Sequence, residues 1–250
     1  MKPMLWISWL LFTGQLLAQS PIPPGTILPV GLNSSLNSRK VKPGQAIVAR
    51  VMQDVPLSPG LAIHAGAKVI GQVVDVRPAN AINGGQISFR FDTVVISRHP
   101  TPVTTNLRAL ASMLAVEEAQ LPESGPDRGT SEYSWTTNQI GGEVVYRGGG
   151  PVANGLVTVG QPAYHGVLVR PSAKPGTTCR GEVEGNDRLQ ALWVFSSDAC
   201  EVYGFENLTI VHAGRSDPTG RITLASDRGD INVRAGSGML LRVNKTTGRH

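Results

Sequence analysis

The sequence predicts a mainly β protein, a β-barrel with an inserted or appended disulfide-tied β subdomain and little helix. Apolar side chains recur at every second position of residues 86–95, as in a strand with one face in a core. Pro-Gly pairs at 24–25, 43–44 and 59–60 mark turns between short strands. The chain contains 29 Gly and 18 Pro but only 16% charged residues, a composition typical of many turns and few exposed helices.

The N-terminus has the three parts of a secretory signal peptide. Lys2 supplies a positive start, the run 4–17 is apolar, and Ala18 is a small residue suited to cleavage. The run is shorter than the roughly 20 residues that a membrane-crossing helix needs. We therefore expect residues 1–18 to be removed and the mature chain to be periplasmic or secreted from a bacterium. The alternative is an uncleaved anchor helix.

Strand patterns follow one another through the first part of the mature chain. Residues 46–52, 68–77 and 86–95 each read as a strand, and Gly71 inside the second predicts a bulge or a barrel corner. After an extended stretch, apolar residues at helical spacing over 107–114 predict a short helix.

Three further ranges complete the predicted organisation. Residues 121–137 are polar and rich in Pro and Gly, which predicts a linker or exposed loop. Residues 140–214 contain a second group of short strands and are expected to form the inserted subdomain. The barrel is expected to comprise residues 24–111 and 221–243. Two sequential β domains are the alternative. The strands expected in the second group are 143–147, 156–159, 166–170, 189–195 and 208–212.

The chain has two cysteines, Cys179 and Cys200. In an exported protein an even pair predicts a disulfide, which for a loop of this length contributes about 3 kcal/mol to stability. A thiol redox site is disfavoured because the pair lacks C-x-x-C spacing.

Several short motifs resemble a known family. The motifs are Pro24-Gly25-Thr26-Ile27-Leu28-Pro29-Val30, Pro43-Gly44-Gln45, Ala49-Arg50-Val51, Ala65-Gly66-Ala67, Ile70-Gly71 and the tail Gly238-Met239-Leu240-Leu241-Arg242-Val243. They resemble the C-terminal β-barrel domain of TrbI-like conjugal-transfer proteins, scaffold subunits of type IV secretion channels, and are equally similar to uncharacterised exported proteins of soil bacteria. The resemblance implies a barrel completed by a late strand after a glycine, and an envelope location. The inner-membrane helix, Pro-rich arm and membrane-inserting helical pair of that family have no counterpart, so a channel is not implied.

No residue pattern predicts catalysis, a metal or a cofactor. The five histidines lack zinc-site spacing. A hydrolase set of His165, His212 and Asp198 with Ser196 or Ser197 is weighed as an alternative, without the expected nucleophile turn. The acidic residues near 182–187 are interpreted as a solvated loop rather than a glycosidase pair. The glycines at 148–150 and 236–238 are interpreted as turns, and Arg-Gly-Asp at 228–230 as a chance match.

The net charge and the aromatic content limit which classes of binding partner the sequence predicts. A net charge of +5 without a dense basic run, and 5% aromatic residues, argue against nucleic-acid binding. Tyr133 and Trp135 lie in the polar stretch and are candidate contact residues that could stack on sugar rings. The sequence thus predicts a non-catalytic envelope protein that docks with an envelope protein partner. The alternative is a secreted carbohydrate-binding module with a polysaccharide ligand.

Overall fold

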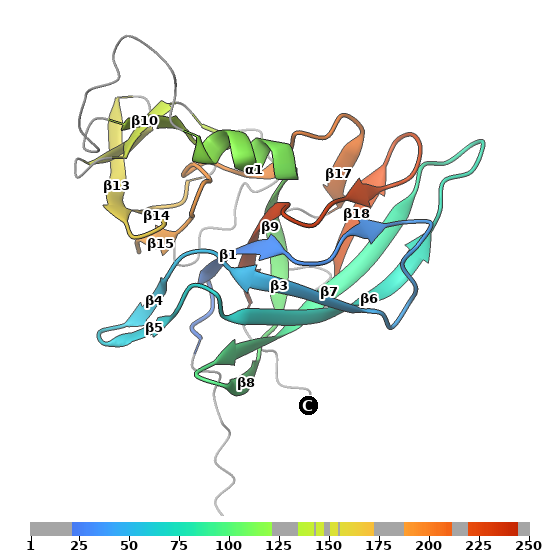
Figure 1. The fold of residues 1–250 in the computed structure, drawn as a ribbon, viewed down its shortest axis with the longest axis horizontal. Coiled ribbons are helices and arrows are strands. Elements are labelled where there is room, and N and C mark those ends of the chain that lie inside the picture. Colours follow the sequence, from blue (N-terminus) through green and yellow to red (C-terminus); the bar gives the residue numbers. More distant parts are fainter. Residues whose placement is uncertain are drawn as a thin grey trace, which may run out of the picture.

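Most of the chain in the computed structural model is β-strand (Figure 1). The structure describes residues 22–121, 135–142, 144–147, 151–154, 156–172, 188–211 and 220–244. Within them a ten-stranded sheet has the order β16-β9-β20-β1-β3-β6-β7-β18-β17, and β8 pairs with β7. The end strands β16 and β17 follow each other in the chain and contact each other, so the sheet is a nearly closed barrel. The predicted fold class is confirmed to this extent.

The barrel strands are β1 (Ile27–Leu32), β3 (Ala46–Val51), β6 (Lys68–Arg77), β7 (Gln86–Ile96), β8 (His99–Pro102), β9 (Thr105–Ala111), β16 (Glu201–Tyr203), β17 (Leu208–Val211), β18 (Ile222–Ser226) and β20 (Gly238–Val243). Two short pairs extend from it, β2 (Leu36–Asn37) with β19 (Asn232–Val233) and β4 (Val55–Ser58) with β5 (Leu61–Ile63). The second region contains β10 (Trp135–Asn138), β11 (Val144–Arg147), β12 (Val152–Asn154), β13 (Val157–Ala163), β14 (Gly166–Val169) and β15 (Gln190–Ala191), and the helix is α1 (Met113–Gln120).

The two ends of the described chain meet in the middle of the sheet. Strand β20 pairs antiparallel with β1, with Val30 opposite Met239, and on its other edge with β9. The predicted completion of the barrel by the C-terminal strand is therefore confirmed.

Two hydrophobic cores lie on opposite faces of these central strands. One fills the barrel with side chains such as Phe89 and Phe91, whose rings meet edge to face at 5.8 Å. The other lies between the outside of the barrel and the second region, and includes Trp193 and Phe195. Every residue of β1, β9 and β20 is buried. Strands covered on both faces often carry continuous apolar runs, as β1 does, whereas β9 and β20 also bury charged residues, Arg108 and Arg242.

Strands with one solvent face alternate as expected. In β3 the buried side chains Ile47, Ala49 and Val51 point into the barrel. The pairing of β6 with β7 shifts register beside Gly71, where an added Cβ would lie 1.9 Å from the carbonyl oxygen of Arg90. The predicted bulge is present, and glycine is required because the neighbouring backbone occupies the side-chain position.

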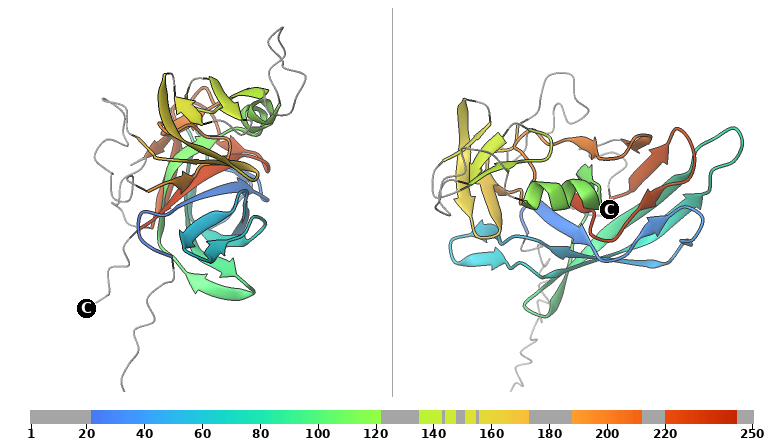
Figure 2. Two further views of the ribbon diagram at one scale, coloured as in Figure 1. Left: turned by 90° about the vertical axis from the view of Figure 1, so that its left-hand side faces the viewer. Right: turned by 45° about the horizontal axis from the view of Figure 1, so that its top comes forward.

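The second region packs against the barrel beside α1 (Figure 2). Its four-stranded sheet has the order β12-β13-β14-β15, and β10 pairs with β11. Strands β16 and β17 lie within the predicted inserted range 140–214, yet they hydrogen bond to β9 and β18 of the barrel sheet. Strand β10 begins at Trp135, inside the range 121–137 that was expected to be a linker. The strand expected over 189–195 is wrong beyond Ala191: residues 192–195 form a turn in which the Phe195 amide donates to the Leu192 carbonyl. The division into a barrel and an inserted unit stays a prediction.

A buried glutamine joins the second region to the barrel. Gln53, fully buried after β3, donates from Nε2 to the Val167 carbonyl at 2.9 Å. Its Oε1 accepts from the backbone amides of Val167 at 3.2 Å and Trp193 at 2.7 Å. These bonds hold the β13–β14 hairpin and the Trp193 turn against the end of β3.

The helix α1 begins immediately after β9. Ser112 caps it, with Oγ accepting from the Ala115 amide at 3.1 Å. The strand runs to Ala111, four residues further than the sequence indicates, because Leu107 and Leu110 point into the barrel core. Among the described residues, no helix has the length and hydropathy required to cross a membrane.

Candidate functional site

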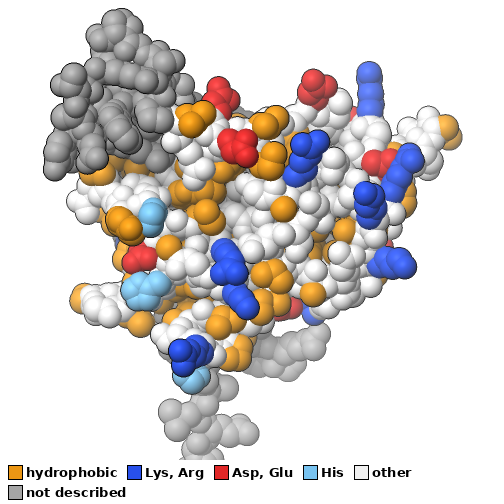
Figure 3. Space-filling view, in the orientation of Figure 1, with side chains coloured by type: hydrophobic (Ala, Val, Ile, Leu, Met, Phe, Trp, Pro, Cys, Tyr) orange, Lys and Arg blue, Asp and Glu red, His pale blue; other side chains and the backbone are white. Residues whose placement is uncertain are grey.

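A groove runs between α1 and the outer surface of β1 and β3, and we call it the α1 groove. It has a volume of about 420 Å³ and is open to solvent. Its lining residues are Gly31, Leu32, Asn33, Arg50, Met52, Met113, Val116, Glu117, Gln120, Trp193 and Gly236. Figure 3 shows hydrophobic side chains on the surface below α1, with charged side chains around them.

Gly236 and Gly238 let α1 and the Trp193 turn approach the barrel, and Gly31 lets the Met52 side chain pack on β1. At Gly238, an added Cβ would lie 2.9 Å from Val116 and 3.2 Å from the Trp193 ring. At Gly236 it would lie 2.9 Å from Met113, and at Gly31 it would lie 3.0 Å from the Met52 sulfur. The groove floor is therefore backbone with little side-chain cover, and larger residues at these positions would displace its walls.

The groove combines adaptable apolar walls with charges of opposite sign. Met52 and Met113 are half-buried, and methionine side chains are flexible and polarizable, which suits surfaces that accommodate another chain. Trp193 supplies a largely buried aromatic surface. Arg50, on β3, and Glu117, on α1, are exposed at the groove. An extended apolar segment with an acidic and a basic residue fits this arrangement.

A buried arginine anchors the loop that follows the Trp193 turn. Arg108 is only 1% exposed. The register of β9 with β20 passes over this residue, which forms a β-bulge, and its side chain projects from the bulge toward the second region. Nε donates to the Ala199 carbonyl at 2.9 Å, and Nη2 donates to the carbonyls of Ser172 and Ser197. The guanidinium thus satisfies backbone acceptors that the loop would otherwise bury without a partner.

Asp198 on that loop belongs to a hydrogen-bond network. Its Oδ1 accepts from the hydroxyls of Ser172 at 3.0 Å and Ser197 at 2.7 Å, and from the Asn154 amide. In a nucleophile–base–acid set the acid contacts histidine, and histidine contacts the serine. Here the carboxylate contacts serine directly, which is the geometry of a structural network.

The histidines and Ser196 of the predicted hydrolase set are placed only in part. His165 is exposed at the β13–β14 turn, and His212 falls outside the described residues. Ser196 is buried and packs within contact distance of Gly142. The hydrolase alternative therefore gains no support from the described geometry and stays a prediction.

Tyr203 bonds back to the backbone of Cys200, in the loop beside the Asp198 network. Its hydroxyl donates to the Cys200 carbonyl at 2.7 Å and accepts from the Cys200 amide at 3.0 Å. Burial raises the pKa of Tyr203, so the hydroxyl stays protonated and can serve as both donor and acceptor. Cys200 is buried, whereas Cys179 lies outside the described residues, so the disulfide between them stays a prediction.

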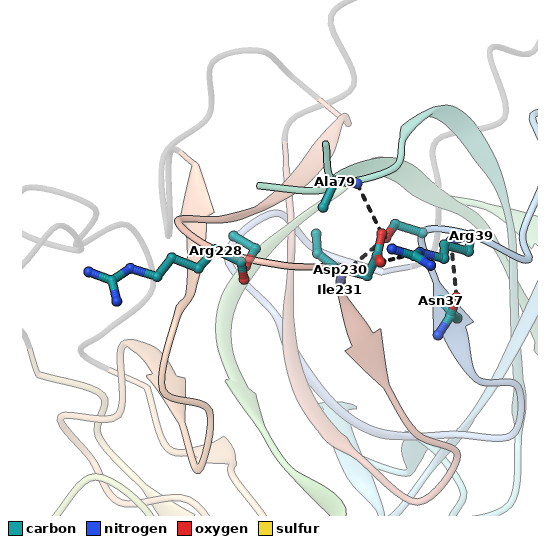
Figure 4. Close-up of polar contacts among 8 residues, drawn as sticks. Asn37, Arg39, Ala79, Arg228, Asp230 and Ile231 are labelled. Carbon is teal, nitrogen blue, oxygen red and sulfur yellow. Dashed lines mark hydrogen bonds and ion pairs between the residues drawn. The ribbon is translucent and has the colours of Figure 1, made fainter. Parts of the chain in front are cut away.

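The Arg-Gly-Asp sequence has a structural role for its acidic residue (Figure 4). Asp230 accepts from the Ser38 hydroxyl and from the Ala79 amide, both at 2.9 Å, and forms an ion pair with Arg39. These bonds, with the Ala79 amide first, hold the pKa of Asp230 below its ordinary value. Arg228 points away from this cluster. The carboxylate is thus occupied within the fold rather than offered to a receptor.

The candidate sugar-contact residues are only partly placed. Tyr133 lies outside the described residues, and Trp135 begins strand β10, where only the backbone is described. The glycines 148–150 and the acidic residues near 182–187 also lie outside the described part of the chain. Trp193, interpreted as a core residue from its apolar neighbours, is 4% exposed, as expected.

Within the described ranges, no three His, Cys, Asp or Glu side chains are grouped so as to hold a metal ion. Sequence reasoning missed the α1 groove altogether. The two methionines and the glycines that form it are far apart in the chain, and only the barrel brings them together.

The chain was compared with protein-family models and with curated proteins. No family model matches it, and no curated protein matches it significantly. Its class is therefore given by its structure, a nearly closed β-barrel carrying a packed second region and an open apolar groove.

Proposed function

We propose that the protein is exported to the bacterial cell envelope and acts there as a non-catalytic interaction module. Its barrel, of the kind found in TrbI-like secretion-channel subunits, docks another envelope protein in the α1 groove. The observation that carries this proposal is the groove itself, an open apolar trough of about 420 Å³ lined by Met52, Met113 and Trp193. Exposed apolar surface of this kind, bordered by polar residues, is typical of protein-binding sites.

The occupant is an extended apolar segment of the partner. It carries an acidic residue beside Arg50 and a basic residue beside Glu117, because opposite charges at a groove fix the direction of the bound chain. Apolar anchors contribute most of the affinity, and the two charge pairs select the orientation.

The signal-like N-terminus and the Cys179–Cys200 pair support the envelope location, since disulfides persist in oxidising compartments. The alternative predicted from sequence, a carbohydrate-binding module acting through Tyr133 and Trp135, rests on side chains outside those described.

The proposal is tested by purifying the tagged full chain from crosslinked envelope fractions and comparing three variants. Met113→Lys places a charge in the groove wall, and Glu117→Lys reverses a charge at its edge. Ile82→Lys is the matched control, because Ile82 is 89% exposed in the β6–β7 loop. Each variant is first shown to melt at the wild-type temperature.

We expect one envelope protein to be recovered with the wild type and with Ile82→Lys. Its recovery should fall about tenfold with Met113→Lys and by a smaller factor with Glu117→Lys. Recovery of the chain alone, or equal recovery of the same protein with all variants, would show that the groove does not dock a partner.

A further inference from the structure

The tip of the β13–β14 hairpin meets the base of the β4–β5 hairpin at one end of the molecule. Figures 1 and 2 show β4–β5 beside β13–β14. The buried Gln53 side chain bonds to Val167 and Trp193, as described above, and Asp54 follows it directly in the chain. Gly166 packs so closely on Gln53 that an added Cβ would lie 2.2 Å from Oε1. The β13–β14 tip is therefore held at a fixed spacing from the base of the β4–β5 hairpin.

The base of the β4–β5 hairpin presents a carboxylate and an imidazole, from the residues just before β4 and just after β5. Asp54 Oδ1 accepts from the Ala65 amide at 2.8 Å, and Oδ2 contacts His64 Nδ1 at 3.1 Å. The Ala65 amide first, and then the His64 ring, hold the pKa of Asp54 below its ordinary value. Both side chains remain accessible, with exposed fractions of 49% for Asp54 and 78% for His64. Asp54 thus keeps free acceptor capacity, because a carboxylate accepts about four hydrogen bonds.

The β13–β14 tip presents an aromatic surface. Tyr164 is 80% exposed, and its ring lies 3.8 Å from the ring of His165, centroid to centroid. The contacts of Gln53 with Gly166 and Val167 hold this tip beside Asp54, and His165 is among the groups that lower the pKa of Asp54. In Figure 3 an acidic side chain on this flank of the molecule lies between two histidines.

His165 occupies a backbone conformation that favours glycine. Its φ is +61°, at the second central position of a two-residue hairpin turn. A non-glycine residue with this φ carries a conformational cost. Burial of the imidazole ring does not offset this conformational cost, because His165 is exposed and contacts Tyr164. It instead supports the Tyr164 ring on one side and leaves the other side open.

We propose that Asp54 and His64 at the β4–β5 base and Tyr164 and His165 at the β13–β14 tip, together the hairpin cluster, bind a neutral pyranose sugar. One face of the sugar ring stacks on Tyr164, and two of its hydroxyls donate to the Asp54 carboxylate. Aromatic rings pack well against the apolar C–H face of a sugar, and hydrogen bonds to an ionised carboxylate are about twice as strong as neutral ones. An anionic sugar is disfavoured because it would lie against Asp54.

A hollow beside His64 gives room for a further sugar unit. It has a volume of about 240 Å³ and is lined by residues of β5, the following turn and the end of β7, including Ile63, Ala67 and Val95. A chain of at least two units can therefore extend from Tyr164 past His64. The ligand class is an oligosaccharide of neutral hexoses rather than a single sugar. This site is separate from the α1 groove and does not depend on the docking function.

The test is calorimetric titration of the full mature chain with the hexasaccharides of cellulose, starch and chitin. These probes differ in linkage and in the substituent at one ring carbon, while all are uncharged. We expect at least one to bind with millimolar affinity or better. Tyr164→Ala should weaken that binding about tenfold or more, and Asp54→Asn about fivefold, because the amide retains the bond from Ala65 but loses the charge.

Two further variants separate binding from folding. Leu156→Ala removes an equally exposed side chain at the start of β13 and should leave affinity unchanged. His165→Gly removes the backbone cost and should raise the melting temperature, yet weaken sugar binding. No heat with any of the three probes would overturn the proposal. Binding that Tyr164→Ala leaves intact would overturn it equally, since the sugar would then lie elsewhere.

Discussion

Replacement of Gln53 by methionine tests whether the second region is held to the barrel by buried hydrogen bonds. The side chain is fully buried and bonds to the Val167 carbonyl, the Val167 amide and the Trp193 amide. Methionine has a similar length and fills the same space, so the change removes hydrogen bonds without a large cavity.

The three lost bonds do not cost the same free energy. The Val167 carbonyl also accepts from the Leu192 amide at 3.2 Å, and so it keeps a partner. The amides of Val167 and Trp193 lose the acceptor that Gln53 provides. A buried donor without a partner costs about 1–3 kcal/mol, and two of them give a loss of about 3 kcal/mol in the free energy of unfolding. That is a large part of the stability of a typical domain.

Urea denaturation followed by tryptophan fluorescence measures this loss. The matched control is Gln45→Met, because Gln45 is exposed and its side chain accepts only from the Lys42 amide at 3.2 Å among the bonds described. The control should lose less than about 0.5 kcal/mol. A loss below about 1 kcal/mol for Gln53→Met would refute the reasoning, because the two amides would then have found water or another acceptor.

Three further predictions concern the barrel and its attached loops. Arg108→Met should lower the free energy of unfolding, measured in urea, by about 3 kcal/mol, because the buried Ala199 and Ser172 carbonyls lose the donor that Arg108 provides. An unchanged free energy would mean that removal of the buried charge compensates for the lost hydrogen bonds. Gly71→Ala should lower the melting temperature strongly, since its Cβ would lie 1.9 Å from the Arg90 carbonyl oxygen. A melting temperature equal to that of the wild type would contradict this. Asp230 has a folded-state pKa below its unfolded value of 3.8, so its charge stabilises the fold above pH 3.8 and this contribution disappears as the pH falls through the lowered pKa. The stability difference between wild type and Asp230→Asn should therefore shrink on acidification, and a difference independent of pH would refute the assignment.

Strands with one solvent-exposed face could be predicted from the sequence, whereas β9, which is buried on both faces, was predicted only in part. The alternation of residues 86–95 identifies β7 almost to its ends, and residues 68–77 identify β6. Strand β9 reads instead as the start of a helix, because both of its faces are covered and its apolar residues lose the period of two. The helix α1 follows only after Ser112, where a capping side chain begins it.

The second region was harder to predict because tertiary contacts decide its conformation. Residues 192–195 are apolar and suggest a strand, yet they turn so that Trp193 and Phe195 both enter the core outside the barrel. Their backbone amides find partners in Gln53 and Leu192 rather than in a neighbouring strand. A propensity for β structure cannot anticipate a buried glutamine supplied from a distant part of the chain.

The candidate sites show the same limit. Tyr133 and Trp135 were chosen because aromatic residues in a polar stretch suggest contact, whereas the structure leaves Tyr164 exposed at the β13–β14 turn, where it contacts His165. The α1 groove depends on Met52 and Met113 facing each other across the surface of β1. No local pattern records that proximity, because it follows from the pairing of β9 and β1 with β20.

Docking in the α1 groove is tested most directly by photocrosslinking in living cells that naturally produce the protein. A photoreactive amino acid is placed at Gln120 or Asn33, on opposite walls of the groove, and at Ile82 as the control. The account predicts that Gln120 and Asn33 yield a covalent adduct with one and the same envelope protein, and that Ile82 yields none with it. Absence of an adduct from both groove positions, or the same adduct from Ile82, would contradict the account.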